Sequence, residues 1–186
     1  MFAIPGIEAT SSDAVDFLLY FYNCKDLEEF YHKFIKHKHL KSRGFDLKKL
    51  NLTTEELLDD ARLYNCVISL PHPFAMRPKK SYIYMQKHPK MMKYIDAIEG
   101  INSVMHINDN ENATEWAKNL KKGVTGGSDA HLVKHLGRAV TASYAETVEE
   151  FLDGILKKKN IVVGRSLDPI SKLYAKALIF KRNLNW

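Results

Sequence analysis

Two short stretches of the chain combine residue types that can bind a metal ion. In TGGSDAHLVKHLG, residues 125–137, Asp129 and His131 stand two residues apart after a pair of glycines. In VISLPHPF, residues 67–74, His72 stands between two prolines at the end of an apolar run. Carboxylate oxygen and imidazole nitrogen are good ligands for zinc, manganese and iron. These stretches therefore suggest metal chemistry.

The local sequence suits these side chains to such a role. Side chains two residues apart point the same way in an extended segment, so Asp129 and His131 could reach one cluster. The glycines before them allow a tight turn, and the prolines beside His72 restrict its backbone. Each motif alone is a weak signal, because turns favour Asp and Gly for purely local reasons.

The elements that would position these residues are strands that alternate with helices. Apolar runs rich in Ile and Val predict strands, and amphipathic segments with capping residues predict helices. The predicted strands are residues 2–8, 15–22, 66–71, 95–101, 123–127, 138–144 and 160–165. The predicted helices are residues 26–37, 53–65, 112–122, 147–159 and 169–183. This alternation predicts an α/β fold with a largely parallel sheet or an α/β barrel.

Polar residues stand where several predicted strands end. In barrels and parallel sheets the strand ends form one rim, where sites are built. The strand-end residues are Glu8, His72, Asn102, Asp129 and His131. Their convergence is more informative than any one of them. The other histidines (His32, His37, His39, His88, His106 and His135) lie in helical or lysine-rich settings, and we expect them at the surface or at helix ends.

Length and composition fit one globular domain in the cytoplasm. The chain has 186 residues, of which 45% are hydrophobic and 27% charged, and no linker or repeat divides it. It lacks an apolar run of about 18 residues and a signal-peptide pattern, so no membrane role is expected. Cys24 and Cys66 lack metal-ligand spacing, which indicates free thiols.

A net charge of +6 favours anionic partners, namely phosphorylated molecules or nucleic acid. No aromatic signature of nucleic-acid binding accompanies the lysines, so solvated loops and helix ends explain them better. The segment 77–92, RPKKSYIYMQKHPKMM, is expected as a variable loop over the rim. Its Arg77, Lys79 and Lys80 could contact phosphate or simply face solvent.

With these motifs in order, the chain resembles the PHP family, the metal-dependent phosphoesterase domain named after polymerase and histidinol phosphatase. IPGIEAT resembles the family's glycine-x-glutamate motif, and SLPHPF its Ala-His-Pro element with Pro71 for the alanine. IDAIEGINS resembles its strand that ends in Asn. TGGSDAH, with the following LG and VT, is the strongest match, and residues 148–165 continue in register.

The resemblance implies a distorted (β/α)7 barrel with up to three divalent metal ions (Zn, Mn or Fe) at the rim. It implies hydrolysis of a phosphate ester, either a phosphomonoester or a nucleotide-type substrate, by a metal-activated water. Glu8 would bridge two metals and His72 would bind one of these. Asp129 would bind the first metal, and His131 the remaining one.

Two departures from the family pattern limit this expectation. Where the family has a histidine in the next strand, Asp16 is the nearest candidate, either as a ligand that favours harder cations or as an ordinary polar residue. The family's His-x-His and Thr-Asp-His elements precede the glutamate motif and have no counterpart in residues 1–186. We thus expect an N-terminally incomplete barrel, the C-terminal three quarters of one domain, with fewer metals.

An incomplete barrel has an open sheet edge, which prompts pairing with a partner or a second copy of the chain. The alternative to an enzyme is a catalytically incomplete remnant that binds metal or phosphate or serves as an assembly module.

Overall fold

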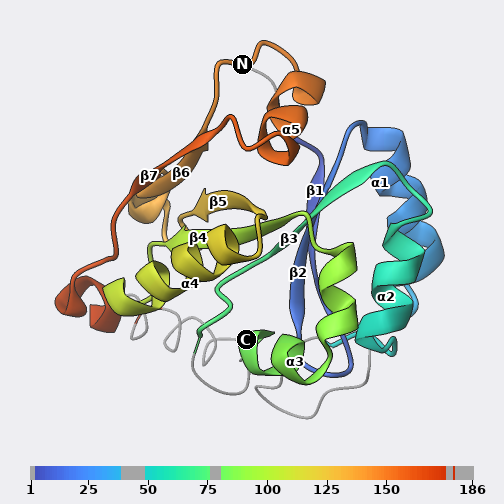
Figure 1. The fold of residues 1–186 in the computed structure, drawn as a ribbon, viewed down its shortest axis with the longest axis horizontal. Coiled ribbons are helices and arrows are strands. Elements are labelled where there is room, and N and C mark those ends of the chain that lie inside the picture. The colour runs from blue at the N-terminus through green and yellow to red at the C-terminus, as the bar shows by residue number, and fades with distance from the viewer. Residues whose placement is uncertain (1–2, 39–48, 76–80, 175–177, 179–186) are drawn as a thin grey trace.

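The computed structural model describes residues 3–38, 49–75, 81–174 and 178, and in them a central mixed sheet is flanked by helices (Figure 1). Five strands follow one another across this sheet in chain order. They are β1 (Gly6–Thr10), β2 (Asp16–Phe21), β3 (Cys66–Leu70), β4 (Ala97–Asn102) and β5 (Gly123–Gly127). Strands β6 (Ala139–Ala142) and β7 (Ile161–Gly164) form a separate antiparallel pair.

The sheet is less parallel than expected. Strands β3, β4 and β5 are parallel to one another, whereas β2 is antiparallel to both β1 and β3. The physical reason lies in the short turn at residues 11–15. A link of this length can join antiparallel neighbours, whereas parallel neighbours need a crossover of about a dozen residues or more. The first two strands therefore form a hairpin.

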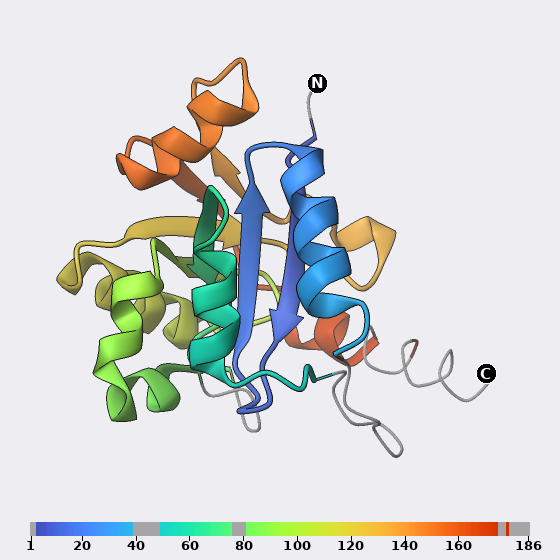
Figure 2. The ribbon, with the colours of Figure 1, turned by 90° about the vertical axis from the view of Figure 1, so that its right-hand side faces the viewer.

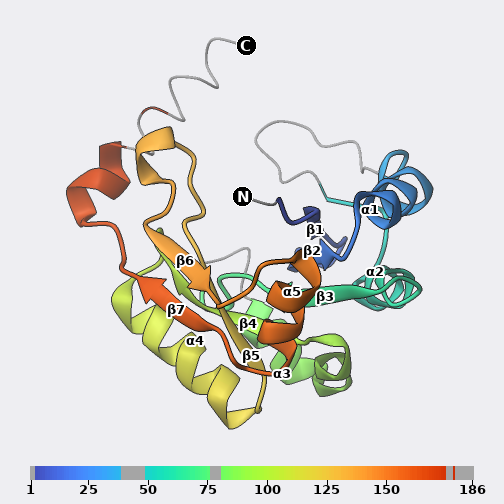
Figure 3. The ribbon, with the colours of Figure 1, turned by 90° about the horizontal axis from the view of Figure 1, so that it is seen from above.

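The expected (β/α)7 barrel is not confirmed. Among the described residues no sheet closes, and β1 and β5 are the outer strands of the five-stranded sheet. The coarser expectation, an α/β fold with a central sheet and helices, is confirmed. Figure 3, seen from above, shows the β6–β7 pair lying beside β4 and β5.

One face of the sheet packs on the main hydrophobic core. Alternate residues of β2, Phe17, Leu19 and Phe21, are buried there, as the period of a strand requires. Helices α1 (Cys24–Phe30) and α2 (Thr54–Ala61) cover this face at β1 and β2 (Figure 2). Helix α4 (Ile107–Asn119) lies along β4 (Figure 1) and adds Ala117 to the same core. We call this the helical face.

The opposite face, which we call the inner face, has a smaller core and more polar residues. Val67 of β3 and Ala97 of β4 pack there against Leu152 and Ile155 of helix α5 (Val148–Leu156). Further along the parallel strands, the hydroxyls of Ser69 on β3 and Thr125 on β5 hydrogen bond to each other at 3.0 Å in the interior. The inner face is therefore apolar near the starts of the parallel strands and polar near their ends.

Most predicted elements are present with shifted ends. All seven predicted strands are found, and α2 has the complete capping box of Thr53 and Glu56. In α5, Thr147 caps the backbone of Glu150, but the Glu150 carboxylate accepts from Glu146, so the predicted reciprocal box is only half formed. The predicted helix 112–122 begins earlier, at Ile107. The helix expected from Pro169 is described through residue 174.

The segment expected as a loop over the rim is partly helical. Helix α3 (Ser81–Lys87) and the 3-10 helix Pro89–Tyr94 occupy most of it. Met85 and Met91 are buried in the main core, which explains why this segment is ordered into helices. Arg77, Lys79 and Lys80 lie outside the described residues. No described helix is long and apolar enough to cross a membrane.

Candidate metal centre

The sheet topology brings several strand ends to one edge. The start of β2 pairs with the end of β1 through Asp16 and Thr10. Because β2 is antiparallel to β3, this start also lies near the end of β3, which His72 follows by two residues. The parallel strands β4 and β5 finish at the same edge. Chain segments far apart in sequence thus meet there.

Three side chains at this edge form a compact group of potential ligands. One ligand atom each from Glu8, Asp16 and His72 lies within 4.8 Å of the other two. His72 Nε2 is 3.8 Å from Glu8 Oε1 and 3.7 Å from Asp16 Oδ2. Glu8 lies in the middle of β1 and not at its end as expected, because β1 continues to Thr10. The cross-strand register still places it near Asp16.

The backbone of His72 is held in an unusual conformation. Its φ is +31°, in the left-handed region that costs a non-glycine residue about 1–3 kcal/mol. Its N–H donates to Glu99 Oε2 at 2.8 Å. Burial lowers the pKa of the imidazole, but the nearby carboxylate of Glu8 and the charges of Glu99, Asp16 and Asp129 together raise it above the ordinary value. A positive charge is therefore favoured at this position.

Glu99 is a buried carboxyl group that the sequence analysis did not identify. Glu99 is only 4% exposed, and burial raises the pKa of its carboxyl group to about 7. Hydrogen bonds from the Asn102 side chain and from the His72 backbone lower this pKa and partly offset the effect of burial. The available signal was an acidic residue inside the otherwise apolar strand AIEGIN, since an acid is rarely buried there without a partner.

Asp129 joins the group through one amide. Asn102 Nδ2 donates to Glu99 Oε2 at 3.0 Å and to Asp129 Oδ2 at 3.3 Å. Asp129 has a φ of +46°, so the segment is not extended and the alternation argument for Asp129 and His131 does not hold. His131 Nδ1 nevertheless lies 3.7 Å from Asp129 Oδ1 and 3.1 Å from its carbonyl oxygen. The His131 side chain is 51% exposed and outside the three-residue group.

The donor set fits a divalent cation. Two carboxylates and one imidazole converge, and the Nδ1 of His72 is buried without a hydrogen-bond partner among the described residues. Oxygen and nitrogen donors of this kind suit manganese, iron or zinc. The side chains of Glu8 and Asp129 are 48% and 31% exposed, which leaves the group open to solvent on one side.

The remaining histidines that the structure describes lie at the surface or at a helix end, as expected. His135 lies at a helix end but is only 2% exposed, and its Nε2 has no hydrogen-bond partner in the described part of the chain. It ends the 3-10 helix Val133–His135, which carries its ring inward. His39 lies outside the described residues. The histidines found at the surface are His32, His37, His88 and His106, the last of which caps α4.

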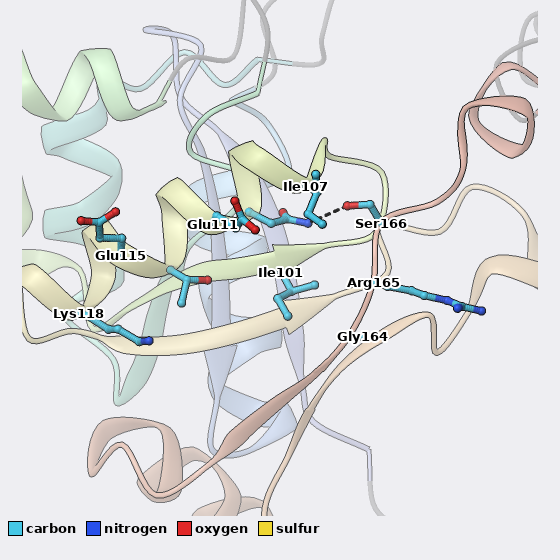
Figure 4. Close-up of a pocket in the computed structure, with 10 residues that line it drawn as sticks. Ile101, Ile107, Glu111, Glu115, Lys118, Gly164, Arg165 and Ser166 are labelled. Atoms are coloured by element: carbon cyan, nitrogen blue, oxygen red, sulfur yellow. Dashed lines mark hydrogen bonds between the residues drawn. The ribbon is translucent and has the colours of Figure 1, made fainter.

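A separate pocket of about 480 Å³ lies between α4 and the segment that follows β7 (Figure 4). Its polar side chains include Glu111, Glu115 and Lys118 along α4, together with Arg165 and Ser166. None of the candidate ligands lines this pocket, so it is distinct from the metal centre.

The fold and this cluster define a mixed α/β protein with a carboxylate–imidazole site at one sheet edge. The family model described as PHP-associated matches residues 108–160, which include all of α4 but its first residue, β5 and the Asp129 segment. An uncharacterized protein of Methanocaldococcus jannaschii is 33% identical over 92 residues, which cover 48% of this chain and 39% of that protein. The match thus spans about two fifths of the length of this curated relative.

Two solved structures share the fold. A lesion-specific endonuclease of Pyrococcus furiosus has a TM-score of 0.64 and 23% identity, over 88% of this chain and 42% of that one. The second is a two-domain protein of Bacteroides vulgatus that contains a predicted PHP-like metal-dependent phosphoesterase. Its TM-score is 0.52 at 13% identity, and the match covers 92% of this chain and 48% of that one. The PHP-associated match supports the family resemblance of the motifs, and the two solved structures show that the fold is shared.

Proposed function

We propose that this chain carries the activity of a metal-dependent phosphoesterase, hydrolysing a phosphate ester with a metal-activated water. The convergence of Glu8, Asp16 and His72 within 4.8 Å is the observation that carries this proposal. The PHP-associated family match and the fold shared with PHP-like metal-dependent phosphoesterases support it. A phosphomonoester and a nucleotide-type diester are both within this class of substrate.

Glu8, Asp16 and His72 would hold a divalent cation, with Asp129 and His131 as further donors on the open side. Three of these five are carboxylates, which favours manganese or iron over zinc. A cation held there would supply Lewis-acid activation of water and neutralise charge on the phosphate.

The charge around His72 favours a bound cation at this site. Four carboxyl groups, those of Glu8, Asp16, Glu99 and Asp129, surround one imidazole, and each favours positive charge on it. A phosphate dianion that approached this set alone would meet like charge at short range. Bound cations reverse that field, so we expect phosphate binding to follow metal binding.

The experiment is a paired measurement of metal content and hydrolysis. Purified chain loaded with Mn²⁺ is assayed with p-nitrophenyl phosphate and with bis(p-nitrophenyl) phosphate, which separates monoesterase from diesterase activity. Glu8→Ala and Asp16→Asn should lose both metal and activity. Glu28→Ala, which removes an exposed carboxylate from α1, is the matched control and should retain both.

Two results would change the conclusion. Metal binding without hydrolysis of either ester would favour the alternative, a PHP remnant that binds metal or phosphate. This alternative has its own support, because the compact group offers three ligands where zinc normally takes about four. A chain that binds neither Mn²⁺, Fe²⁺ nor Zn²⁺ would refute both.

A further inference from the structure

Glu99 occupies the space between the two parts of the candidate centre, yet it belongs to neither. It is not in the group of Glu8, Asp16 and His72, whose ligand atoms lie within 4.8 Å of one another. We propose that Glu99 is a positioning residue, which fixes His72 relative to Asp129. This inference rests on the proposed function for its chemical purpose, but the contacts that carry it do not depend on a metal.

One oxygen of Glu99 receives two donors from different chain segments. Its Oε2 accepts from the backbone N–H of His72 at 2.8 Å and from Asn102 Nδ2 at 3.0 Å. Burial strengthens these hydrogen bonds, because it excludes water as a competitor for the Glu99 oxygen. The loop after β3 is thereby tied to strand β4.

The connection continues to Asp129 through the same amide. Asn102 Nδ2 also donates to Asp129 Oδ2 at 3.3 Å. Asn102 Oδ1 accepts from the backbone N–H of Val104 at 2.9 Å, which orients the amide with its nitrogen toward the two carboxylates. The path from His72 to Asp129 therefore consists of one carboxylate and one amide, both on β4.

The surrounding structure leaves the Glu99 carboxylate little freedom. A Cβ at Gly127 would lie 2.5 Å from Glu99 Oε1, so β5 approaches the carboxylate closely only because a glycine stands there. His72 needs such an anchor, because its left-handed backbone at φ +31° is costly unless surrounding contacts hold it. We therefore assign Glu99 the role of holding the candidate ligand His72 in place, and not that of binding the metal itself.

Two substitutions separate the hydrogen-bond role of Glu99 from its charge. Glu99→Gln keeps an oxygen that can accept from His72 and Asn102, whereas Glu99→Leu keeps the approximate volume and removes both acceptors. Glu115→Leu on α4 removes an exposed carboxylate and is the matched control. The Mn²⁺ dissociation constant is measured by electron paramagnetic resonance, and thermal unfolding verifies that each variant is folded.

We expect Glu99→Leu to weaken Mn²⁺ binding by about 10–100-fold, which is typical when a group that orients a ligand is lost. Glu99→Gln and Glu115→Leu should remain close to the unmodified chain. Unchanged Mn²⁺ affinity in folded Glu99→Leu would overturn the positioning role, as would equal losses in the Gln and Leu variants. If Glu99→Leu does not fold, Asn102→Ala breaks the same connection from the other side and is judged by the same criteria.

A second readout separates this inference from the proposed function. Hydrogen exchange of the His72 backbone amide, followed by NMR in the metal-free chain, should be faster in Glu99→Leu than in Glu99→Gln. If the unmodified chain binds no metal, the proposed function fails, and amide exchange alone decides whether Glu99 positions His72. Equal exchange rates in the two variants would then overturn the inference.

Discussion

The side chain of Asn110 makes two hydrogen bonds to the backbone of Asn102. Its Oδ1 accepts from the Asn102 N–H at 3.0 Å, and its Nδ2 donates to the Asn102 carbonyl at 3.0 Å. Helix α4 thereby provides hydrogen-bond partners for the backbone N–H and C=O of Asn102, the last residue of β4. The same residue, Asn102, links Glu99 with Asp129, so α4 supports the candidate centre without reaching it.

Loss of this clamp should destabilise the protein. Asn110→Leu removes the side-chain acceptor of the buried Asn102 N–H and leaves the Asn102 carbonyl with the Met105 N–H, and an unsatisfied buried N–H costs about 1–3 kcal/mol in the free energy of unfolding. Urea denaturation measures the difference. Asn112→Leu, at an exposed position of the same helix, should have little effect, and equal losses in the two variants would contradict this role for Asn110.

A methyl group at Gly127 should disturb the same region from β5. Gly127→Ala places a carbon 2.5 Å from Glu99 Oε1, and overpacking of this kind typically costs about 1–3 kcal/mol. Gly154→Ala in α5 is the control, because its new carbon would meet chiefly the movable hydroxyl of Ser143. Denaturation midpoints that rank the variants in the opposite order would show that Glu99 has room to move.

Divalent metal should raise the thermal stability of the chain. A ligand that binds only the folded state at about 100 times its dissociation constant adds about 2.7 kcal/mol. Differential scanning calorimetry with Mn²⁺ or with EDTA tests this. Asp16→Asn should abolish the Mn²⁺ effect, and an equal rise in that variant would place the metal elsewhere.

Stability should depend on pH through the capping box of α2. The backbone N–H of Thr53 donates to Glu56 Oε2 at 2.8 Å, and this bond, with a second from the Thr53 hydroxyl, lowers the pKa of Glu56 below 4.5. A lowered folded-state pKa stabilises the protein above 4.5, and this contribution is lost as the pH falls through the lowered value. Glu56→Gln should therefore reduce stability at neutral pH but not in stronger acid, which urea denaturation at the two pH values measures.

The two thiols should differ in reactivity. Cys24 is exposed, whereas burial raises the pKa of the Cys66 thiol to about 12. Since the thiolate is the reactive form, we expect one thiol per chain to react rapidly with Ellman's reagent at pH 8 and the other only in denaturant. Rapid reaction of the single remaining thiol in native Cys24→Ser protein would indicate that β3 opens readily.

Sequence reasoning predicted the strands well because their apolar runs are short and clearly bounded. It misjudged the direction of β2, because alternation of residues shows that a strand exists but not which way it runs. Helix α3 was missed because the aromatic and methionine residues of its segment, Tyr82 to Met85, carry no strong helical period. These features depend on contacts between distant segments.

In the candidate centre, too, local motifs were predictable from the sequence, whereas contacts between distant segments were not. The motifs pointed to Glu8, Asp16 and His72, which the structure brings together, and to Asp129 beside them. Glu99 was missed because its importance comes from what it touches across the sheet. Metal occupancy of these residues stays a prediction.

The register of the β1–β2 hairpin has a consequence for how the chain acquires its site. Glu8 stands opposite Leu18, while its neighbour Ala9 stands opposite Phe17 and is buried in the main core. A slip of one residue would exchange the two faces and drive the Glu8 carboxylate into that apolar interior. A hairpin in the wrong register is therefore destabilised even without metal. Because only the correct register presents Glu8 as a ligand, cation binding reports that the hairpin has formed correctly.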